Sequence, residues 1–222
     1  MTVAEVRRKQ LVDAYANHNG KCVAYIDESY VAPSSDRGTR RTFYLITAYV
    51  IDVDWIEEIR DALPTIVGAN FWHSTDSHRT EEGKQKIRSF ANYVGEGDEP
   101  VIVSMQRPID ISDSDGEAAR RSCFKNLLSL LASGTHCNTV ELAIFEERKY
   151  ASQRNADART VSDAIRESLI PRSMRVLATS PTYEKLLWLP DIVSFALYHD
   201  HFETQFEYAQ PFRSRVQTVF CK

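Results

Sequence analysis

Cysteine is scarce in this chain. Its 222 residues include four cysteines, at positions 22, 123, 137 and 221, and no two of them form a C-x-x-C pair. This scatter argues against a zinc ribbon or a thioredoxin-like redox motif. It favours reduced, mostly buried thiols in a cytoplasmic protein.

Glycine is scarce as well, at eight residues. Dinucleotide-binding α/β enzymes carry a G-x-G-x-x-G turn after a strand, because glycine lets the backbone approach the pyrophosphate closely. No strand-like run in this chain is followed by such a turn. The sequence therefore disfavours a dinucleotide-binding enzyme.

Long apolar runs and a net positive charge are also missing. Charges at Glu5, Arg7, Arg8 and Lys9 interrupt the apolar stretch that a signal peptide needs, and no later run approaches the length of a membrane span. We therefore expect a soluble, cytoplasmic protein without membrane contacts. Because the formal net charge is -4, any binding of nucleic acid must depend on local basic residues and on metal ions.

Apolar and charged residues are present in ordinary proportions, 43% and 26%. A chain of this length can bury a sizeable core. No internal repeat, low-complexity tract or linker divides it. We therefore predict a single domain over residues 1–222, with a helical insertion at 54–94 and a C-terminal tail at 204–222.

The order of apolar runs predicts a mixed α/β sheet. Two β-like runs, 22–28 and 42–51, are joined by a polar loop and should form an antiparallel hairpin. Further on, strands alternate with helices, and such helical crossovers give parallel neighbours. These strands are expected near 100–106, 139–146 and 174–179. The sequence thus predicts a five-stranded sheet flanked by helices, with the insertion between the second and third strands.

Acidic residues stand at the ends of two of these strands. Asp27 and Glu28 close the first strand, and Glu146 and Glu147 close the run that begins at Val140. A carboxylate is costly to bury, so this placement indicates a neutralising partner or metal. Because side chains alternate along a strand, Asp27 and Glu28 face opposite ways, and we favour Asp27 as the ligand. The ends of neighbouring parallel strands meet at one edge, which places Glu146 beside Asp27.

A third acid stands at the start of the last predicted helix. Asp191 follows Pro190 in an apolar stretch, and proline suits a first helical turn. Acids also occupy first turns for the helix dipole alone. Because Asp191 is expected on an element adjacent to those of Asp27 and Glu146, we favour one site formed by all three acids. The secondary candidates are Glu28, Glu147 and Glu117.

Three stretches of the chain carry a resemblance to a known family. They are Tyr25-Ile-Asp-Glu-Ser29, Ile144-Phe-Glu-Glu-Arg148 and Leu187-Trp-Leu-Pro-Asp-Ile-Val193. They are similar to the first-strand IDES(G) motif, the D-E-R strand and the LQLADL helix of the family catalogued as domain of unknown function 3800. Phe71-Trp-His73 adds a histidine in the inserted region, where that family often has one. The departures are Tyr30 for Gly, Glu146 for Asp, Trp188 for Gln and Pro190 for Ala.

The resemblance implies a ribonuclease H-like fold and a metal-dependent nuclease or a related defence or mobile-element function. Phosphodiester hydrolysis suits a carboxylate cluster, because Mg²⁺ or Mn²⁺ prefers oxygen ligands and can activate water. The hypothesis is a nuclease acting on DNA or RNA, with Asp27, Glu146 and Asp191 as catalytic metal ligands and His73 as a neighbour. The change to Glu at 146 keeps a second hypothesis open, a catalytically silent ribonuclease H-like module that binds nucleic acid or a protein partner.

Basic residues near the proposed site are candidates for contacts with backbone phosphates. They are Arg37, Arg40 and Arg41 in the loop between the first two strands, and Arg148 and Lys149 after the Glu146 strand. The same charges also suit ordinary solvated positions that pair with nearby acids. The aromatic-rich tail is expected to pack on the core or on a second subunit, which allows a homo-oligomer.

Overall fold

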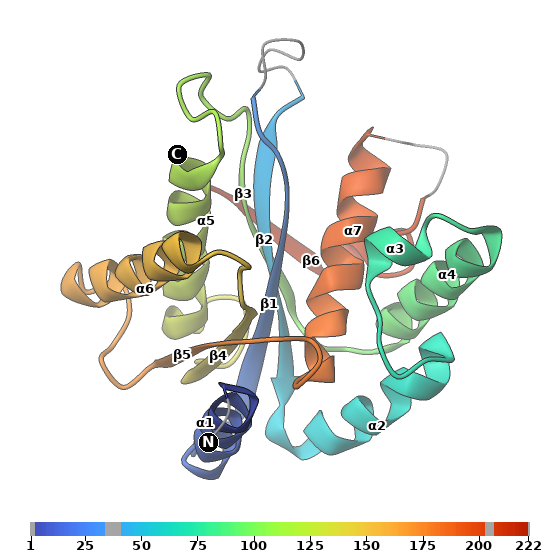
Figure 1. Cartoon of the computed structure of the whole chain (residues 1–222), viewed down its shortest axis with the longest axis horizontal. Coiled ribbons are helices and arrows are strands. Elements are labelled where there is room, and N and C mark those ends of the chain that lie inside the picture. Colours follow the sequence, from blue (N-terminus) through green and yellow to red (C-terminus); the bar gives the residue numbers. More distant parts are fainter. Residues whose placement is uncertain (1–2, 34–40, 203–206, 222) are drawn as a thin grey trace.

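The computed structural model describes residues 3–33, 41–202 and 207–221. Within these residues, one mixed sheet of six strands has the order β5-β4-β1-β2-β3-β6, and helices cover both of its faces (Figure 1). The strands are β1 (Cys22–Val31), β2 (Phe43–Asp52), β3 (Val101–Gln106), β4 (Leu142–Glu146), β5 (Arg175–Thr179) and β6 (Val216–Phe220).

The α-helices are α1 (Val3–Ala16), α2 (Ile56–Val67), α3 (Ser74–Ser77), α4 (Glu81–Glu96), α5 (Glu117–Ser133), α6 (Ala151–Arg166) and α7 (Trp188–Phe202). Three short 3-10 helices complete the set: η1 (Val53–Trp55), η2 (Lys185–Leu187) and η3 (Arg213–Arg215). Among the described residues, no helix combines the length and the apolar character that crossing a bilayer requires.

Side-chain alternation along β1 divides the core into two layers. Val23 and Tyr25 point toward the layer formed with α2, α4 and α7, whereas Ala24 and Ile26 point toward the layer formed with α5 and α6. Figure 1 shows the two helical layers on opposite sides of the sheet. Any two successive residues of β1 therefore meet different helices.

The predicted hairpin of β1 and β2 is present, and β1 extends beyond the end of β4, its parallel neighbour. β1 and β2 pair antiparallel over their full lengths, with Asp27 opposite Thr47. β1 and β4 pair in parallel only as far as Ile26 opposite Phe145. From Asp27 onward, β1 runs past the last register pair with β4 and ends only at Val31, so the prediction that Asp27 and Glu28 close the first strand is wrong. The end of β4 lies beside Asp27, as predicted for Glu146.

The expected α/β class, a mixed sheet flanked by helices with a helical insertion between strands two and three, is confirmed. The predicted number of five strands is wrong. Residues 216–220 of the predicted tail form β6, a strand at the edge of the sheet that pairs in parallel with β3. Earlier in the same tail, Tyr208 and Phe212 are buried in the core, as predicted for its aromatic residues, whereas Phe220 on β6 is exposed.

Candidate active site

Three acids from three different elements line one cavity of about 450 Å³. Asp27 lies on β1, Glu146 is the last residue of β4, and Asp191 lies in the first turn of α7. We call these three residues the acidic cluster. The structure thus brings together the three carboxylates that the sequence selected.

Asp27 faces the layer that contains α7. Its partner across the hairpin is Thr47, and the Thr47 hydroxyl accepts a hydrogen bond of 2.8 Å from Ser194 of α7. Burial raises the pKa of Asp27 well above its usual range, and the nearby carboxylates of Asp191 and Glu146 raise it further. Arg120 opposes this shift but does not cancel it.

Asp191 is held by the start of α3, a short helix in the insertion. Its Oδ2 accepts hydrogen bonds from the Ser74 backbone N–H at 2.9 Å and from the Ser74 hydroxyl at 2.8 Å. Trp72 donates in turn to the Ser74 hydroxyl oxygen at 3.0 Å. Burial raises the pKa of Asp191, while His73 and these hydrogen bonds oppose the rise. The insertion therefore fixes the carboxylate without neutralising it.

Glu146 completes the acidic cluster at the end of β4. Burial is the main cause that raises its pKa, and the charge of Asp191 raises it further, whereas His73 lowers it. Like charges that share a site make one another harder to ionise. Without a cation, the three carboxyls of the acidic cluster therefore resist full ionisation together.

His73 lies at the rim of the same cavity. Its side chain is 44% exposed, and its Nδ1 lies 3.8 Å from Asp76 Oδ2. Its proximity lowers the pKa of both Glu146 and Asp191. The structure thus places this histidine beside two members of the acidic cluster, where the sequence had put it as a neighbour.

The donor set has the chemistry of a site for a hard divalent cation, since all three side chains offer carboxylate oxygens. A bound cation would also favour the ionised form of these three carboxyls, whose pKa values are raised. Among the described residues, no group of three or more His, Cys, Asp or Glu side chains stands ready-made as a metal site. Binding by all three acids would therefore require their side chains to draw closer.

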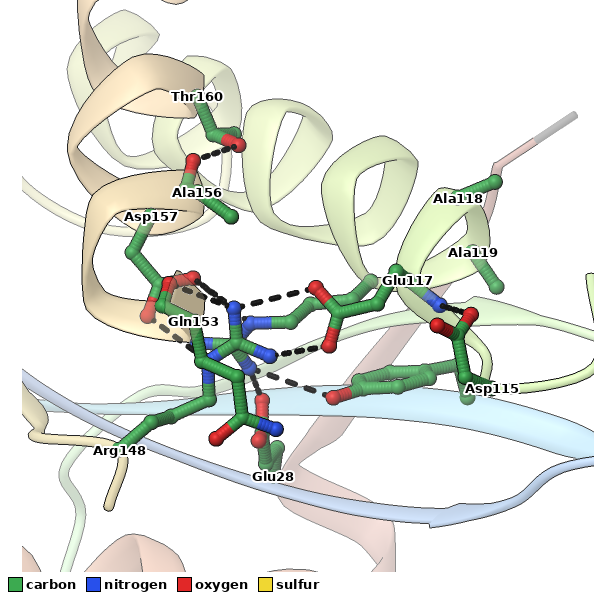
Figure 2. Close-up of polar contacts among 12 residues, drawn as sticks. Glu28, Asp115, Glu117, Ala118, Ala119, Arg148, Gln153, Ala156, Asp157 and Thr160 are labelled. Carbon is green, nitrogen blue, oxygen red and sulfur yellow. Dashed lines mark hydrogen bonds and ion pairs between the residues drawn. The ribbon is translucent and has the colours of Figure 1, made fainter. Parts of the chain in front are cut away.

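On the other face of the sheet, five charged residues form an arginine network, shown in Figure 2. Its members are Glu28, Glu117, Arg120, Arg148 and Asp157. Arg120 contacts Glu28 and donates from Nε to Asp157 Oδ1 at 2.9 Å. Arg148 donates to both oxygens of Asp157 at 3.0 Å and to Glu117 Oε2 at 3.1 Å. Each acid of this network therefore has a guanidinium partner.

The arginine network gives Glu28, Glu117 and Arg148 a structural role, whereas the sequence analysis offered them as candidates for metal or phosphate binding. Glu28 and Glu117 are ion-paired with arginines, and the side chain of Arg148 is only 9% exposed. As placed, Arg148 joins α5 and α6 to the end of β4 and does not reach outward toward a phosphate. Glu147 is paired with Arg7 of α1 and lies 3.5 Å from Arg154.

The remaining basic candidates are spread over the hairpin and the rim. Lys149 is exposed and lines the cavity, with its Nζ 5.6 Å from the centre of the Tyr150 ring. Arg41 is exposed just before β2. Arg37 and Arg40 lie outside the described residues. Lys149 is therefore the basic candidate that the described structure places at the acidic cluster with an exposed side chain.

The sequence interpretation missed Ser74, Arg120 and Asp157. Arg120 stands on the buried face of α5, one turn before Cys123 and Phe124, and a charged residue within such an apolar stripe indicates a buried ion pair. That signal was available in the sequence. Ser74 gave no comparable signal, because its contact with Asp191 spans 117 positions.

Comparisons with known proteins leave the family open. No family model matches the chain, and no curated protein matches it. Among solved structures, the crystal structure of Bst-RNase HIII in complex with Mn²⁺ is similar, with a TM-score of 0.49 and 16% identity. The match covers 86% of this chain and 56% of that one, so this chain spans little more than half of that protein's length. A similarity of this degree assigns neither an activity nor a ligand.

Proposed function

We propose that this chain is a divalent-metal-dependent nuclease that hydrolyses phosphodiester bonds of DNA or RNA. One observation carries the proposal, namely that three carboxylates from β1, β4 and α7 line one cavity and their pKa values are raised. Burying like charges together costs free energy unless a cation compensates them. Strongly perturbed titratable groups in a cleft also favour a functional site over a structural one.

Asp27, Glu146 and Asp191 would hold Mg²⁺ or Mn²⁺, with a local adjustment of their side chains. When bound, such an ion supplies charge neutralisation for a phosphate and lowers the pKa of a coordinated water. Ser74 keeps Asp191 oriented through two hydrogen bonds. His73, at the rim, opposes the rise in the pKa values of Glu146 and Asp191.

The substrate side of the proposal rests on Lys149 at the cavity and on the exposed Arg41 near the hairpin loop. Both can contact backbone phosphates, which carry most of the affinity in nucleic-acid binding. The cavity is lined by Arg120, Arg148 and Lys149 as well as by carboxylates. Beside the acidic cluster itself a phosphate would meet like charge, so we expect productive binding there to require the metal ion.

A cleavage assay with single- and double-stranded DNA and RNA in Mg²⁺ or Mn²⁺ tests the proposal. We expect the unmodified chain to cleave at least one of these substrates, and Asp27→Asn and Asp191→Asn to reduce cleavage at least about a hundredfold, since even residues behind metal ligands are worth 10–100-fold. Asp61→Asn is the matched control, because Asp61 is exposed on α2, away from the cavity.

Cleavage that is equal in the unmodified chain, Asp27→Asn and Asp191→Asn would refute this assignment of the active site. Binding of nucleic acid that weakens with added salt, without cleavage under any of these conditions, would favour the catalytically silent module instead. Thermal unfolding of each variant separates a loss of chemistry from a loss of fold.

A further inference from the structure

Two cysteines from distant parts of the chain meet in the layer that contains α5. The sulfurs of Cys123 and Cys221 lie 3.1 Å apart, although the residues are 98 positions apart in the sequence. Cys123 lies on α5, and Cys221 directly follows β6 at the edge of the sheet. A disulfide bond needs about 2.05 Å between its sulfurs, so a small rotation of the two side chains is sufficient to form one.

The backbone holds both cysteines at this meeting point. Cys221 donates its backbone N–H to the carbonyl of Met105 at 2.9 Å, which continues the pairing of β6 with β3. Cys123 belongs to the buried face of α5, and its thiol lies 3.6 Å from the Tyr44 carbonyl oxygen. The sulfur contact therefore follows from the positions of a strand and a helix.

The two thiols differ in exposure and in acidity. Cys123 is buried, whereas Cys221 is half-buried. The contact with the Cys123 thiol lowers the pKa of Cys221 to about 6, and the same contact raises the pKa of Cys123. A thiolate is the nucleophilic form of cysteine, so Cys221 is the more reactive partner at neutral pH.

We propose that Cys123 and Cys221 form an oxidation site that a peroxide converts into an intramolecular disulfide. The Cys221 thiolate attacks one peroxide oxygen, the O–O bond breaks, and the released hydroxide takes up a proton to become water. Cys221 is then a sulfenic acid. The Cys123 sulfur attacks the Cys221 sulfur, the S–O bond breaks, and the departing hydroxide takes the Cys123 thiol proton as a second water. The two cysteines lose two electrons and the peroxide gains them.

The other two cysteines provide an internal contrast. Burial raises the pKa of both Cys22 and Cys137 to about 11, so each is almost wholly protonated at neutral pH. Protonated thiols react slowly with peroxides. We therefore expect oxidation to select Cys221 and its neighbour over this second pair.

The disulfide would tie the edge of the sheet to a core helix. β6 is the last strand in the sheet order, and its residues Gln217, Thr218 and Phe220 are exposed. Closing a loop of this length restricts the unfolded chain strongly. The oxidised protein should therefore release its C-terminal strand more slowly under limited proteolysis and unfold at a higher temperature than the reduced protein.

Peptide mapping after treatment of the full chain with a slight excess of hydrogen peroxide tests this site. Free thiols are alkylated, and the protein is digested without reductant. We expect one peptide pair joined through Cys123 and Cys221, lighter than the two separate peptides by the mass of two hydrogen atoms. Dithiothreitol should reverse the link. Cys137→Ser should form it as readily as the unmodified chain, and Cys123→Ser should stop at a trappable sulfenic acid on Cys221.

Three results would overturn the proposal. They are a disulfide that joins Cys22 to Cys137 instead, links between different molecules only, and complete alkylation of Cys123 and Cys221 after peroxide treatment. Because Cys123→Ser removes a buried thiol, Cys221→Ser serves as a second variant with a half-buried position. It must abolish the link while leaving the unfolding temperature of the reduced protein nearly unchanged.

Discussion

Asp27 and Glu28 are neighbours in the sequence, yet they belong to two regions with opposite electrostatics. Glu28 joins the arginine network, in which two guanidinium groups serve three carboxylates on the face of α5 and α6. Asp27 joins the acidic cluster on the face of α7, where carboxylates raise one another's pKa values. The two regions nevertheless meet at one cavity, because Glu28, Arg120 and Arg148 line it together with the acidic cluster.

The comparison separates acids that hold the fold together from acids that are available for chemistry. In the arginine network, every charge is paired, Arg120 and Asp157 are buried, and the pairs join β1, the end of β4, α5 and α6. In the acidic cluster, burial is accompanied by repulsion, and the partial charges of Ser74 and His73 offset it incompletely. A folded chain tolerates such a cost when the site serves a function. We therefore expect mutations of the arginine network to lower the free energy of unfolding and removal of a charge from the acidic cluster to raise it.

The largest effect is expected from removing the centre of the arginine network. Arg120→Met leaves Glu28 without its arginine and leaves Asp157 with Arg148 alone. The side chains of Arg120 and Asp157 are 5% and 4% exposed. Breaking a buried pair from one side costs about 3–5 kcal/mol. Urea unfolding should show this loss. Arg79→Met, which removes an exposed pair with Asp76, should cost no more than about 1 kcal/mol. Equal losses in both variants would contradict the structural role of the network.

Adding a divalent ion should have the next largest effect, and it should act on the acidic cluster alone. With free Mg²⁺ or Mn²⁺ at a hundred times its dissociation constant, binding to the folded state adds about 2.7 kcal/mol to the free energy of unfolding. The rise in unfolding temperature should disappear in the double variant Asp27→Asn with Asp191→Asn, and it should persist in Asp61→Asn. A rise of the same size in all three proteins would place the ion elsewhere.

Asp27→Asn should stabilise the metal-free protein, although it abolishes the proposed activity. It removes one of several like charges, which is worth about 1–2 kcal/mol at the distances and effective dielectric of a partly buried site. Urea unfolding near neutral pH measures the gain. A loss of stability as large as that of Arg120→Met would show that Asp27 is a structural acid and would remove the contrast between the two faces.

The pH dependence of stability should also show that ionised Asp27 destabilises the metal-free protein. A carboxyl whose folded pKa is raised holds its proton to higher pH in the folded state than in the unfolded state, where the pKa is about 3.9. This contribution to stability is complete below the unfolded pKa, falls as the pH rises through the folded pKa, and is then gone. Without metal, Asp27→Asn should lose less stability than the unmodified chain between pH 4 and neutrality. Matching unfolding curves at each pH would contradict the raised pKa.

Sequence patterns were sufficient for the sheet centre and for the acidic cluster, because both follow from short-range rules. Alternation along β1 separates Asp27 from Glu28, and parallel pairing brings the end of β4 beside Asp27. The assignment of β6 failed for a physical reason. Val216–Phe220 is a short edge strand with mostly exposed residues, so it lacks the apolar run that marks an interior strand.

The arginine network escaped prediction because its pairs are distant in the sequence. Glu28, Arg120 and Asp157 come from β1, α5 and α6, and only the packing of these elements brings them together. Asp157 lies within α6, on the side of the helix that is buried against α5. The family resemblance and its ligand set stay predictions, and cleavage assays decide them.

Ser74→Ala should give the smallest effect, and it tests whether the acidic cluster is positioned in advance. The hydroxyl of Ser74 donates to Asp191 Oδ2 at 2.8 Å, while its backbone N–H would remain as a second donor. The change also removes the hydrogen bond that the Ser74 hydroxyl oxygen accepts from Trp72, and each hydrogen bond lost costs about 1 kcal/mol. Cleavage should fall roughly tenfold, since residues that orient metal ligands are worth at least that much. Ser112→Ala, which removes an exposed hydrogen bond to Asp110, should leave cleavage unchanged. If Ser74→Ala lost stability without losing cleavage, the serine would anchor α3 to α7 and would not prepare Asp191 for metal binding.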